Sequence, residues 1–348
     1  MVSQQPSQAE TKTVTYGRSH SLQTISVTPL DTHRDGYWVI YIHGGAWRDP
    51  TITSESFDKT AKILRSNPGL PISGIASISY RLSAHPNHPE NERTTPVTDY
   101  RNAKHPDHIR DVEAALAFLQ NTYAFGPRYI LVGHSCGATL AFQAVMGAVA
   151  DHRELAFSGG AGDDGKGAEQ VSMSPGPLPP KLSAQPVAIV GVAGIYDLRR
   201  LQDTHRDISA YREFIEGAFG PDVMLWDGVS PAQMIGSRGV EGGWKNGRLV
   251  VLAHSKNDGL VDWGQVDEMR EALRGWEEAQ AEIPLRELSS RDRRVQILPL
   301  EGPHDDVWIH GDELARAVEY AFIELQQMGL APEPEAMSGS SPRRLRSH

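Results

Sequence analysis

The sequence predicts one doubly wound α/β domain, in which a mostly parallel central sheet is flanked by helices on both faces. Short apolar runs rich in β-branched residues recur along the chain, as expected for strands buried on both faces of a parallel sheet. Helical patterns separate these runs, and this alternation is typical of a sheet built from βαβ units. The six runs cover residues 37–42, 75–80, 129–132, 187–192, 249–253 and 295–298.

The clearest predicted helix lies between the second and third of these runs, over residues 106–122. Within it, Ile109, Val112, Leu116 and Leu119 are spaced three and four residues apart. This spacing places them on one apolar stripe of an amphipathic helix. A helix with one such stripe can cover one face of the predicted sheet.

Composition and charge favour a globular protein that does not bind nucleic acid. The 348 residues include 34 Lys and Arg against 44 Asp and Glu, which gives a net charge of −10. A nucleic-acid binder needs clustered Lys and Arg to displace counterions, so the acidic balance argues against one. The first residues lack the features of a secretion signal, and the longest apolar stretch, residues 138–150, is too short to span a membrane. We therefore expect a cytoplasmic protein with no membrane partner.

Two segments interrupt the α/β pattern. Residues 158–186 are rich in Gly, Pro and Ser. They predict a flexible surface insertion rather than a linker, because strand-like sequence resumes directly after them. Residues 331–348 are predicted to be a disordered tail. The expected organisation is thus a single domain over residues 1–330, followed by this tail.

The sharpest chemical signal is the stretch GHSCG at residues 133–137, which stands between a strand run and a helical run. A G-x-S-x-G motif in this context is typical of a sharp turn that lifts a serine hydroxyl clear of the sheet. Small residues flank the serine because a β-carbon there would clash with the neighbouring strand. We therefore predict Ser135 as a nucleophile. A plain glycine-rich turn is the alternative for the motif taken alone.

A second glycine motif, HGGAW at residues 43–47, directly follows the first strand run. Glycines at this place let backbone N–H groups point into a cleft, so Gly44, Gly45 and Ala46 are predicted as one half of an oxyanion hole. The other half is the N–H after the nucleophile, that of Cys136. The adjoining Trp47 either stacks on an aromatic substrate or packs its loop against the body of the protein.

A nucleophilic serine needs a base, and the base needs an orienting carboxylate. In α/β-hydrolases these follow the serine in the order acid, then histidine. Asp258 and His304 each lie just after a strand run, where open α/β sheets assemble their sites, so we predict them as the acid and the base. Asp262 is the second candidate acid. His254 and His310 are rival bases that lack this combination of order and position.

No metal or other cofactor is expected for this chemistry. His85 and His88, like His105 and His108, have H-x-x-H spacing. Neither pair is accompanied by a third ligand at a suitable spacing, which disfavours zinc. The single cysteine, Cys136, excludes an intramolecular disulfide and a thiolate zinc cluster. Its place inside the serine motif predicts a buried side chain rather than a redox thiol.

With these motifs in order, the sequence resembles the esterase and lipase branch of the α/β-hydrolases. More narrowly, it resembles the kynurenine formamidases (arylformamidases) of the fungal type. The narrower resemblance rests on the HGGAW stretch, which matches that family's H-G-G-x-W, and on the stretches at residues 80–82, 105–111 and 255–261. It covers about residues 37–324, without the predicted insertion.

The resemblance implies an α/β-hydrolase fold and hydrolysis of N-formyl-L-kynurenine to L-kynurenine and formate in tryptophan catabolism. It also implies that Ser135, Asp258 and His304 act as nucleophile, orienting acid and general base, with no cofactor. A broad-range carboxylesterase with the same triad is the alternative. A hydrolase-fold binding protein is disfavoured because all three triad residues are present. The expected partner is a small-molecule substrate, and a homodimer stays open.

Overall fold

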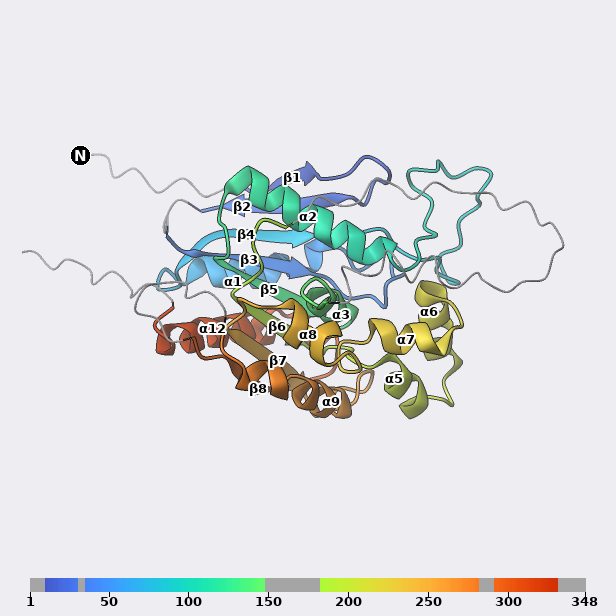
Figure 1. The fold of residues 1–348 in the computed structure, drawn as a ribbon. Helices are drawn as coiled ribbons and strands as arrows, with labels where there is room; N and C mark the ends of the chain where they lie inside the picture. Colours follow the sequence, from blue (N-terminus) through green and yellow to red (C-terminus); the bar gives the residue numbers. More distant parts are fainter. Residues whose placement is uncertain (1–9, 31–34, 148–181, 282–290, 331–348) are drawn as a thin grey trace, which may run out of the picture.

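An eight-stranded sheet forms the centre of the computed structural model, which describes residues 10–30, 35–147, 182–281 and 291–330 (Figure 1). In spatial order the strands are β1 (Lys12–Thr15), β2 (Thr24–Pro29), β4 (Ile72–Ile78), β3 (Tyr37–Ile42), β5 (Tyr129–His134), β6 (Ala188–Val192), β7 (Leu249–Ser255) and β8 (Arg294–Leu300). Strands β3 to β8 pair in parallel, whereas β1 and β2 are antiparallel to their neighbours. The predicted α/β class with a mostly parallel sheet is confirmed.

All six predicted runs correspond to strands of the parallel part of the sheet. Strand β4 begins three residues before the predicted start, because Ile72 already pairs with Tyr37 of β3. The strand ends at Ile78, so Tyr80 lies beyond it. The sequence did not predict β1 and β2. Residues of these strands are largely polar and partly exposed. Strands near a solvated sheet edge need no continuous apolar run, which is the signal that identified the others.

Strand β3 shows why the apolar runs are continuous. Trp38, Ile40 and Ile42 are buried on one side of the sheet, and Val39 and Tyr41 are buried on the other. The first side is covered by α2 (Asp107–Tyr123), α3 (Cys136–Gln143), α9 (Gly264–Ala272) and α10 (Arg274–Glu278). The second is covered by α1 (Asp58–Ser66), α11 (Asp306–Ile309) and α12 (Asp312–Gln327). Both faces therefore exclude water, as in other parallel sheets.

Helix α2 confirms the amphipathic pattern. It spans Asp107–Tyr123, one residue displaced from the prediction at each end, and all four residues of the predicted stripe are buried. The helix ends at Ala124, whose φ of 53° lies in the left-handed region and turns the chain toward β5.

Several helices lie between β6 and β7 in the sequence. They include α5 (Leu198–Thr204), α6 (Ser209–Phe219), α7 (Val223–Val229) and α8 (Val240–Gly243). In Figure 1, α5, α6 and α7 stand together at the end of the molecule toward which the parallel strands point. Phe214 and Phe219 of α6 are buried in the same apolar cluster as α2 and α3. This group of helices therefore packs on the body of the protein.

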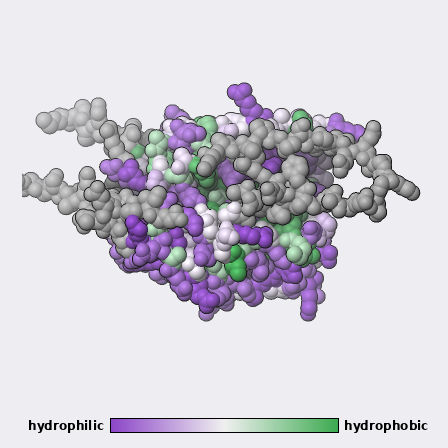
Figure 2. Space-filling view, viewed as in Figure 1, coloured by the Kyte–Doolittle hydropathy of each residue, from purple (hydrophilic) through white to green (hydrophobic). Residues whose placement is uncertain are grey.

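Most of the predicted insertion, residues 158–181, and the predicted tail, residues 331–348, lie outside the described residues. The end of the predicted insertion is described. The backbone N–H groups of Ser183 and Ala184 donate to Oε1 of Gln120 in α2, at 2.9 and 3.3 Å. In the view of Figure 2, hydrophilic side chains cover most of the described surface. Within the described ranges, no helix has the length and apolar character needed to cross a membrane.

Candidate active site

Ser135 stands at the turn between β5 and α3, with φ 53° and ψ −123°. A non-glycine residue with positive φ is strained, and such strain is common at functional sites. The two flanking glycines are required sterically. A Cβ on Gly133 would lie 2.4 Å from the carbonyl oxygen of Gly137, and a Cβ on Gly137 would lie 2.2 Å from that of Ile42 in β3. The clash with a neighbouring strand that the motif predicted is thus present at Gly137.

Replacing Gly137 with alanine is expected to destabilise the fold by about 3 kcal/mol or more, because rigid backbone atoms must move to accept the methyl group. Urea unfolding followed by circular dichroism measures the loss. Gly228→Ala in α7 is the matched control, since nothing lies within 4 Å of the added Cβ there. This control should leave stability unchanged or raise it by up to about 1 kcal/mol. Equal stability of the two variants would contradict the steric argument.

His304 and Asp258 meet at the carboxyl ends of β8 and β7. Nδ1 of His304 lies 2.7 Å from Oδ2 of Asp258, and both side chains are almost fully buried. The other oxygen, Oδ1 of Asp258, accepts from the N–H groups of Leu260 and Val261, each at 2.9 Å. Burial raises the pKa of Asp258, but the hydrogen bond and charge of His304 together with the two N–H donors lower it, so the pKa lies below its ordinary value. The carboxylate is therefore held ionised against the imidazole.

The rival candidates have other partners. Asp262 accepts from the N–H of Gly264 at the start of α9, at 2.9 Å, and pairs with Arg200 at 3.4 Å. His254 is buried in β7 with its Nε2 at 2.9 Å from the carbonyl oxygen of Val261 and 3.7 Å from Oδ2 of Asp258. His310 lies exposed after α11. Of these candidates, only His304 is within hydrogen-bond distance of Asp258.

His134 links the serine turn to the loop that carries His304. Its Nε2 lies 3.2 Å from the backbone carbonyl oxygen of His304, and the two ring centroids are 4.8 Å apart. Because His134 directly precedes Ser135, this contact brings the nucleophile candidate and the base candidate to the same edge of the sheet. Sequence reasoning did not identify this residue, since its role depends on a contact 170 residues along the chain.

The HGGAW loop packs directly against this turn. A Cβ on Gly44 would lie 3.1 Å from Cβ of Ser135, so the absence of a side chain allows the close approach. Gly45, Ala46 and Trp47 all have positive φ, at 94°, 49° and 60°. The N–H of Trp47 donates to Sγ of Cys136 at 3.3 Å, which joins the loop to the first residue of α3. Of the four residues predicted as an oxyanion hole, Gly44 therefore packs against Ser135, and Cys136 directly follows Ser135 in the chain.

The side chain of Tyr80 packs against this loop and holds its shape. The hydroxyl of Tyr80 donates to the carbonyl oxygens of His43 and Gly44, at 3.0 and 3.3 Å, and its ring stacks on His43. Burial raises the pKa of the Cys136 thiol to about 11, so the thiol is protonated near neutral pH. The hydroxyl of Tyr80 thus orients two peptide groups of the loop, a role that only the fold makes visible.

Trp47 is fully buried and its ring packs on α6. The ring meets Phe219 edge to face at a centroid distance of 5.0 Å and lies 6.2 Å from Phe214. This contact holds the loop against α6, as in the second of the two alternatives stated for this residue.

Three buried histidines near the site make stability depend on pH. Burial lowers the pKa of His43 to about 4. Burial also lowers the pKa of His108, with the charge of Arg81, and the pKa of His134, beside His304, to about 3. Below pH ~6.5 the unfolded chain binds protons that the folded chain does not bind. Stability should therefore fall as pH drops from 6.5 toward 4, by about 1 kcal/mol per histidine between pH 7.5 and 5.5.

Urea midpoints of the wild type and of His108→Gln at these two pH values test this expectation. The variant should lose about 1 kcal/mol of the change in stability between pH 7.5 and 5.5, whatever its absolute stability. Identical pH dependence in the two proteins would show that His108 is not the neutral buried group described here.

Potential metal ligands gather at one place in the described part of the chain, where atoms of His134, His304 and Asp305 lie within 4.8 Å of one another. His304 in this group already hydrogen-bonds Asp258. The two H-x-x-H pairs do not join any group of three potential ligands among the described residues. In the second pair, Nε2 of His108 lies 3.0 Å from the hydroxyl of Ser83.

Comparisons with known proteins identify the family of this chain. Residues 27–273 match the BD-FAE family. A kynurenine formamidase-like hydrolase of Fusarium equiseti is 37% identical over 85% of this chain and 86% of its own length. A kynurenine formamidase of Aspergillus versicolor is 35% identical over 78% of this chain and 84% of its own.

Solved esterase structures share the fold at low identity. Esterase B of Lactobacillus rhamnosis superposes with a TM-score of 0.59 at 16% identity, over 94% of this chain and 87% of that one. Esterase 2 of Thermogutta terrifontis gives 0.54 at 15% identity, over 94% and 95%. The predicted resemblance to the fungal formamidases is confirmed, and the protein is a hydrolase by homology. The chain belongs to the BD-FAE family of α/β-hydrolases and is a homologue of the fungal kynurenine formamidases.

Proposed function

We propose that the protein hydrolyses the N-formyl amide of N-formyl-L-kynurenine to L-kynurenine and formate, with Ser135, His304 and Asp258 as a catalytic triad. The observation that supports the substrate most directly is the 37% identity to a kynurenine formamidase-like hydrolase over most of both chains. The observation that supports the mechanism is the 2.7 Å contact between His304 and Asp258 beside the strained Ser135 turn. The proposal includes a small-molecule substrate and a cytoplasmic location.

In the first step, Nε2 of His304 accepts the proton of the Ser135 hydroxyl while the serine oxygen attacks the formyl carbonyl carbon. Oδ2 of Asp258 accepts the hydrogen bond from Nδ1, which keeps Nε2 free to act as a base and stabilises the imidazolium that forms. The two backbone N–H donors on Oδ1 hold the carboxylate in place. This arrangement orients the imidazole before substrate arrives.

The negative charge on the attacked oxygen needs preorganised donors. The backbone N–H groups of Gly45, Ala46 and Cys136 are assigned this role, with Gly44 leaving room beside Ser135. Removal of one such donor typically lowers kcat about 100- to 1000-fold. The Cys136 N–H lies at the start of α3, where the helix dipole also favours negative charge.

The tetrahedral intermediate then collapses. Protonated His304 gives its proton to the nitrogen of the leaving arylamine, the C–N bond breaks, and the formyl group stays on Ser135. His304 takes a proton from water as the water oxygen attacks the formyl carbon. The ester bond then breaks, His304 returns this proton to the Ser135 oxygen, and formate is released. The buried thiol of Cys136 takes no part, since it is protonated near neutral pH.

Steady-state hydrolysis of N-formyl-L-kynurenine and of a short-chain p-nitrophenyl ester tests the proposal. A large preference in kcat/KM for the formyl substrate supports a formamidase. Good ester turnover with negligible deformylation would overturn the substrate assignment and make the protein a general carboxylesterase with the same triad. The molecular mass in solution decides between a monomer and a homodimer.

A further inference from the structure

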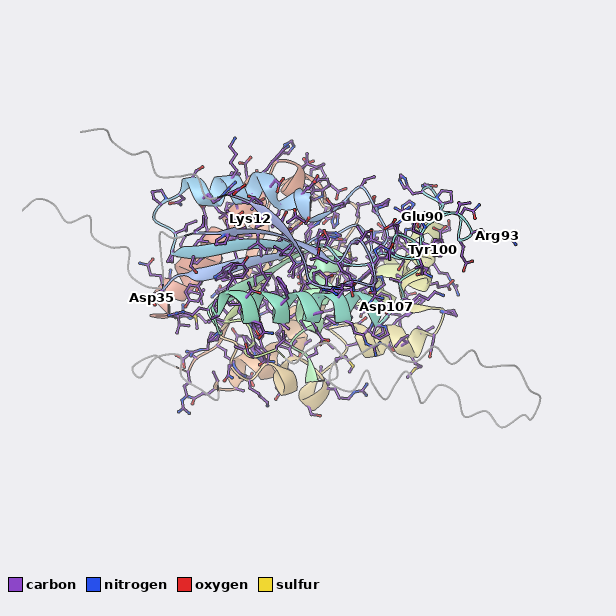
Figure 3. All side chains as sticks on the ribbon, turned by 90° about the horizontal axis from the view of Figure 1, so that it is seen from above. Lys12, Asp35, Glu90, Arg93, Tyr100 and Asp107 are labelled. Carbon is purple, nitrogen blue, oxygen red and sulfur yellow. The ribbon has the colours of Figure 1, made fainter. Side chains whose placement is uncertain are left out.

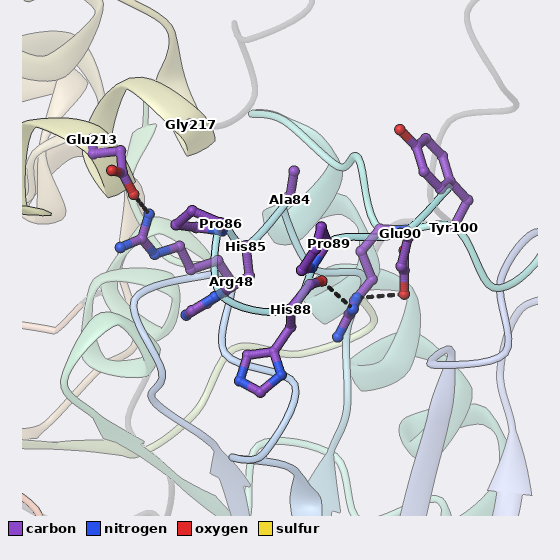
Figure 4. A pocket seen from close by; sticks show the side chains of 11 residues that line it. Arg48, Ala84, His85, Pro86, His88, Pro89, Glu90, Tyr100, Glu213 and Gly217 are labelled. Carbon is purple, nitrogen blue, oxygen red and sulfur yellow. Dashed lines mark hydrogen bonds and ion pairs between the residues drawn. The ribbon is translucent and has the colours of Figure 1, made fainter. Parts of the chain in front are cut away.

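A pocket of about 380 Å³ lies beside the HGGAW loop (Figure 4). Its walls come from the loop after β3, the segment after β4 and helix α6. The side chains that matter below are Arg48, His85, His88, Glu90, Arg101 and Glu213. Four of these carry a formal charge, in a part of the molecule to which the proposed mechanism assigns no residue.

The pocket is built onto the predicted oxyanion loop. Arg48 directly follows Trp47, and its backbone N–H donates to the carbonyl oxygen of Gly45 at 2.9 Å. The carbonyl oxygen of Trp47 accepts from the N–H of Ser83, at the start of the segment that forms the second wall. Figure 3 shows Glu90 and Tyr100 of this segment near the first residue of α2 and far from Asp35, which precedes β3. The pocket therefore lies at the carboxyl end of the strands, where Ser135 stands.

The guanidinium group of Arg48 has N–H donors in this pocket that can bind a ligand. Its side chain is only 12% exposed, Nη1 donates to the carboxylate of Glu213, and its guanidinium lies over the ring of Phe214 at 5.8 Å. Among the described residues, no acceptor is recorded for Nε or Nη2 of Arg48. An arginine held by a ring and one carboxylate can still bind a second carboxylate with its free edge. Glu213 is 52% exposed and is therefore also accessible.

Arg101, Glu90 and His85, three other ionisable groups of the pocket, have partners of their own. Arg101 pairs with Glu90 at 2.7 Å and donates to the carbonyl oxygen of His88 at 2.9 Å. Nδ1 of His85 accepts from the N–H of Asn87 at 3.1 Å, and burial together with the nearby Arg48 lowers the pKa of His85. The cation Arg48 thus lies next to the half-exposed anion Glu213 in this pocket. This pairing matches a zwitterion better than a ligand with a single sign of charge.

We propose that Arg48 binds the α-carboxylate and Glu213 the α-ammonium group of the substrate, so that the enzyme selects aryl formamides that carry a free α-amino acid group. This inference rests on the proposed function, since it assigns the end of N-formyl-L-kynurenine that does not react. The Arg48–Glu213 pair holds the site in a charged, preorganised state before the substrate enters. Selectivity then arises next to the oxyanion loop, where binding of the amino acid group also positions the formamide.

The test compares two ligands in the Ser135→Ala background, which prevents turnover. The ligands are N-formyl-L-kynurenine and 2′-formamidoacetophenone, which keeps the ring, the ketone and the formamide but lacks the amino acid group. Arg48→Gln should raise the Kd of the first ligand about 10- to 100-fold. The Kd of the second should change less than about threefold. Glu213→Gln should weaken the first ligand about 2- to 5-fold, since its carboxylate is half exposed and screened by water.

Arg199→Gln is the matched control, because it breaks an Arg–Asp pair with Asp227 on α5 and α7 outside the pocket. It should leave both Kd values unchanged. Equal weakening of both ligands by Arg48→Gln would show that Arg48 only supports the loop. The inference would also be overturned if N-formyl-L-kynurenine did not bind, or if its Kd did not depend on Arg48. An unchanged Kd in Glu213→Gln would show that Glu213 does not bind the α-ammonium group. Arg48-dependent binding without deformylation by the wild type would instead contradict the proposed function alone.

Discussion

Replacing Ser135 with alanine is expected to lower kcat for N-formyl-L-kynurenine about 10⁴- to 10⁶-fold. The substitution removes the oxygen that attacks the formyl carbon, while the backbone N–H donors of the oxyanion loop remain. Those donors and the binding pocket account for the residual rate over water. Alanine is smaller than serine and adopts the same turn, so the melting temperature should change little. Release of L-kynurenine, followed by its absorbance, measures the rate.

Ser230→Ala controls for the loss of a buried hydroxyl as such. The Ser230 hydroxyl donates to the carbonyl oxygen of Trp226 and accepts from the N–H of Leu198, in the helices between β6 and β7. This control should lose about 1–3 kcal/mol of stability and keep its kcat. Removal of a nucleophile lowers kcat by far more than tenfold. If Ser135→Ala retained more than about a tenth of the wild-type kcat, another group would therefore be the nucleophile.

Asp258→Asn is expected to lower kcat about 10⁴-fold with little change in fold. The physical reason lies in the two backbone N–H groups that donate to Oδ1. They will hold the amide oxygen of asparagine, so that its NH₂ group faces Nδ1 of His304. Nδ1 must then accept a hydrogen bond, and the ring proton moves to Nε2. The histidine can no longer accept the proton of Ser135.

Asp262→Asn separates the two acids that the sequence offered. Asp262 accepts from the N–H of Gly264, the first residue of α9, and pairs with Arg200, so this variant should lose about 1 kcal/mol of stability and little activity. Two outcomes would contradict the assignment of Asp258 as the triad acid. One is a kcat for Asp262→Asn as low as that of Asp258→Asn, and the other is a wild-type kcat for Asp258→Asn. The pH profile of kcat/KM adds a second readout, because only a change at the triad alters the ionisation that limits the rate.

Strands buried on both faces could be predicted well from the sequence, and strands at the edge could not. The run at residues 37–42 coincides with β3 because helices cover both its faces, so that every side chain is apolar. Lys12–Thr15 forms β1 by pairing with β2, and its side chains are largely exposed. Nothing in such a segment distinguishes a strand from a loop until its partner is in place.

Candidate residues of the site could be predicted where chemistry demands a residue type at a turn. Ser135 between two glycines, the glycines after β3, and an aspartate and a histidine after the last two strands all follow that rule. Residues that act through shape could not be found in this way. Tyr80 and His134 hold the loops together through backbone carbonyls that are distant in sequence, and any buried polar side chain can play such a part.

The sequence by itself determined the α/β class, the order of the parallel strands along the chain and the turn that carries Ser135. These depend on local patterns, since burial on both faces and a tight strand-to-helix turn each restrict residue types over a few positions. Tertiary structure alone decided that Trp47 is buried on α6 and that Arg48 meets Glu213. Each of these is a contact between segments far apart in the chain, and packing of the whole domain selects it among several chemically equivalent candidates.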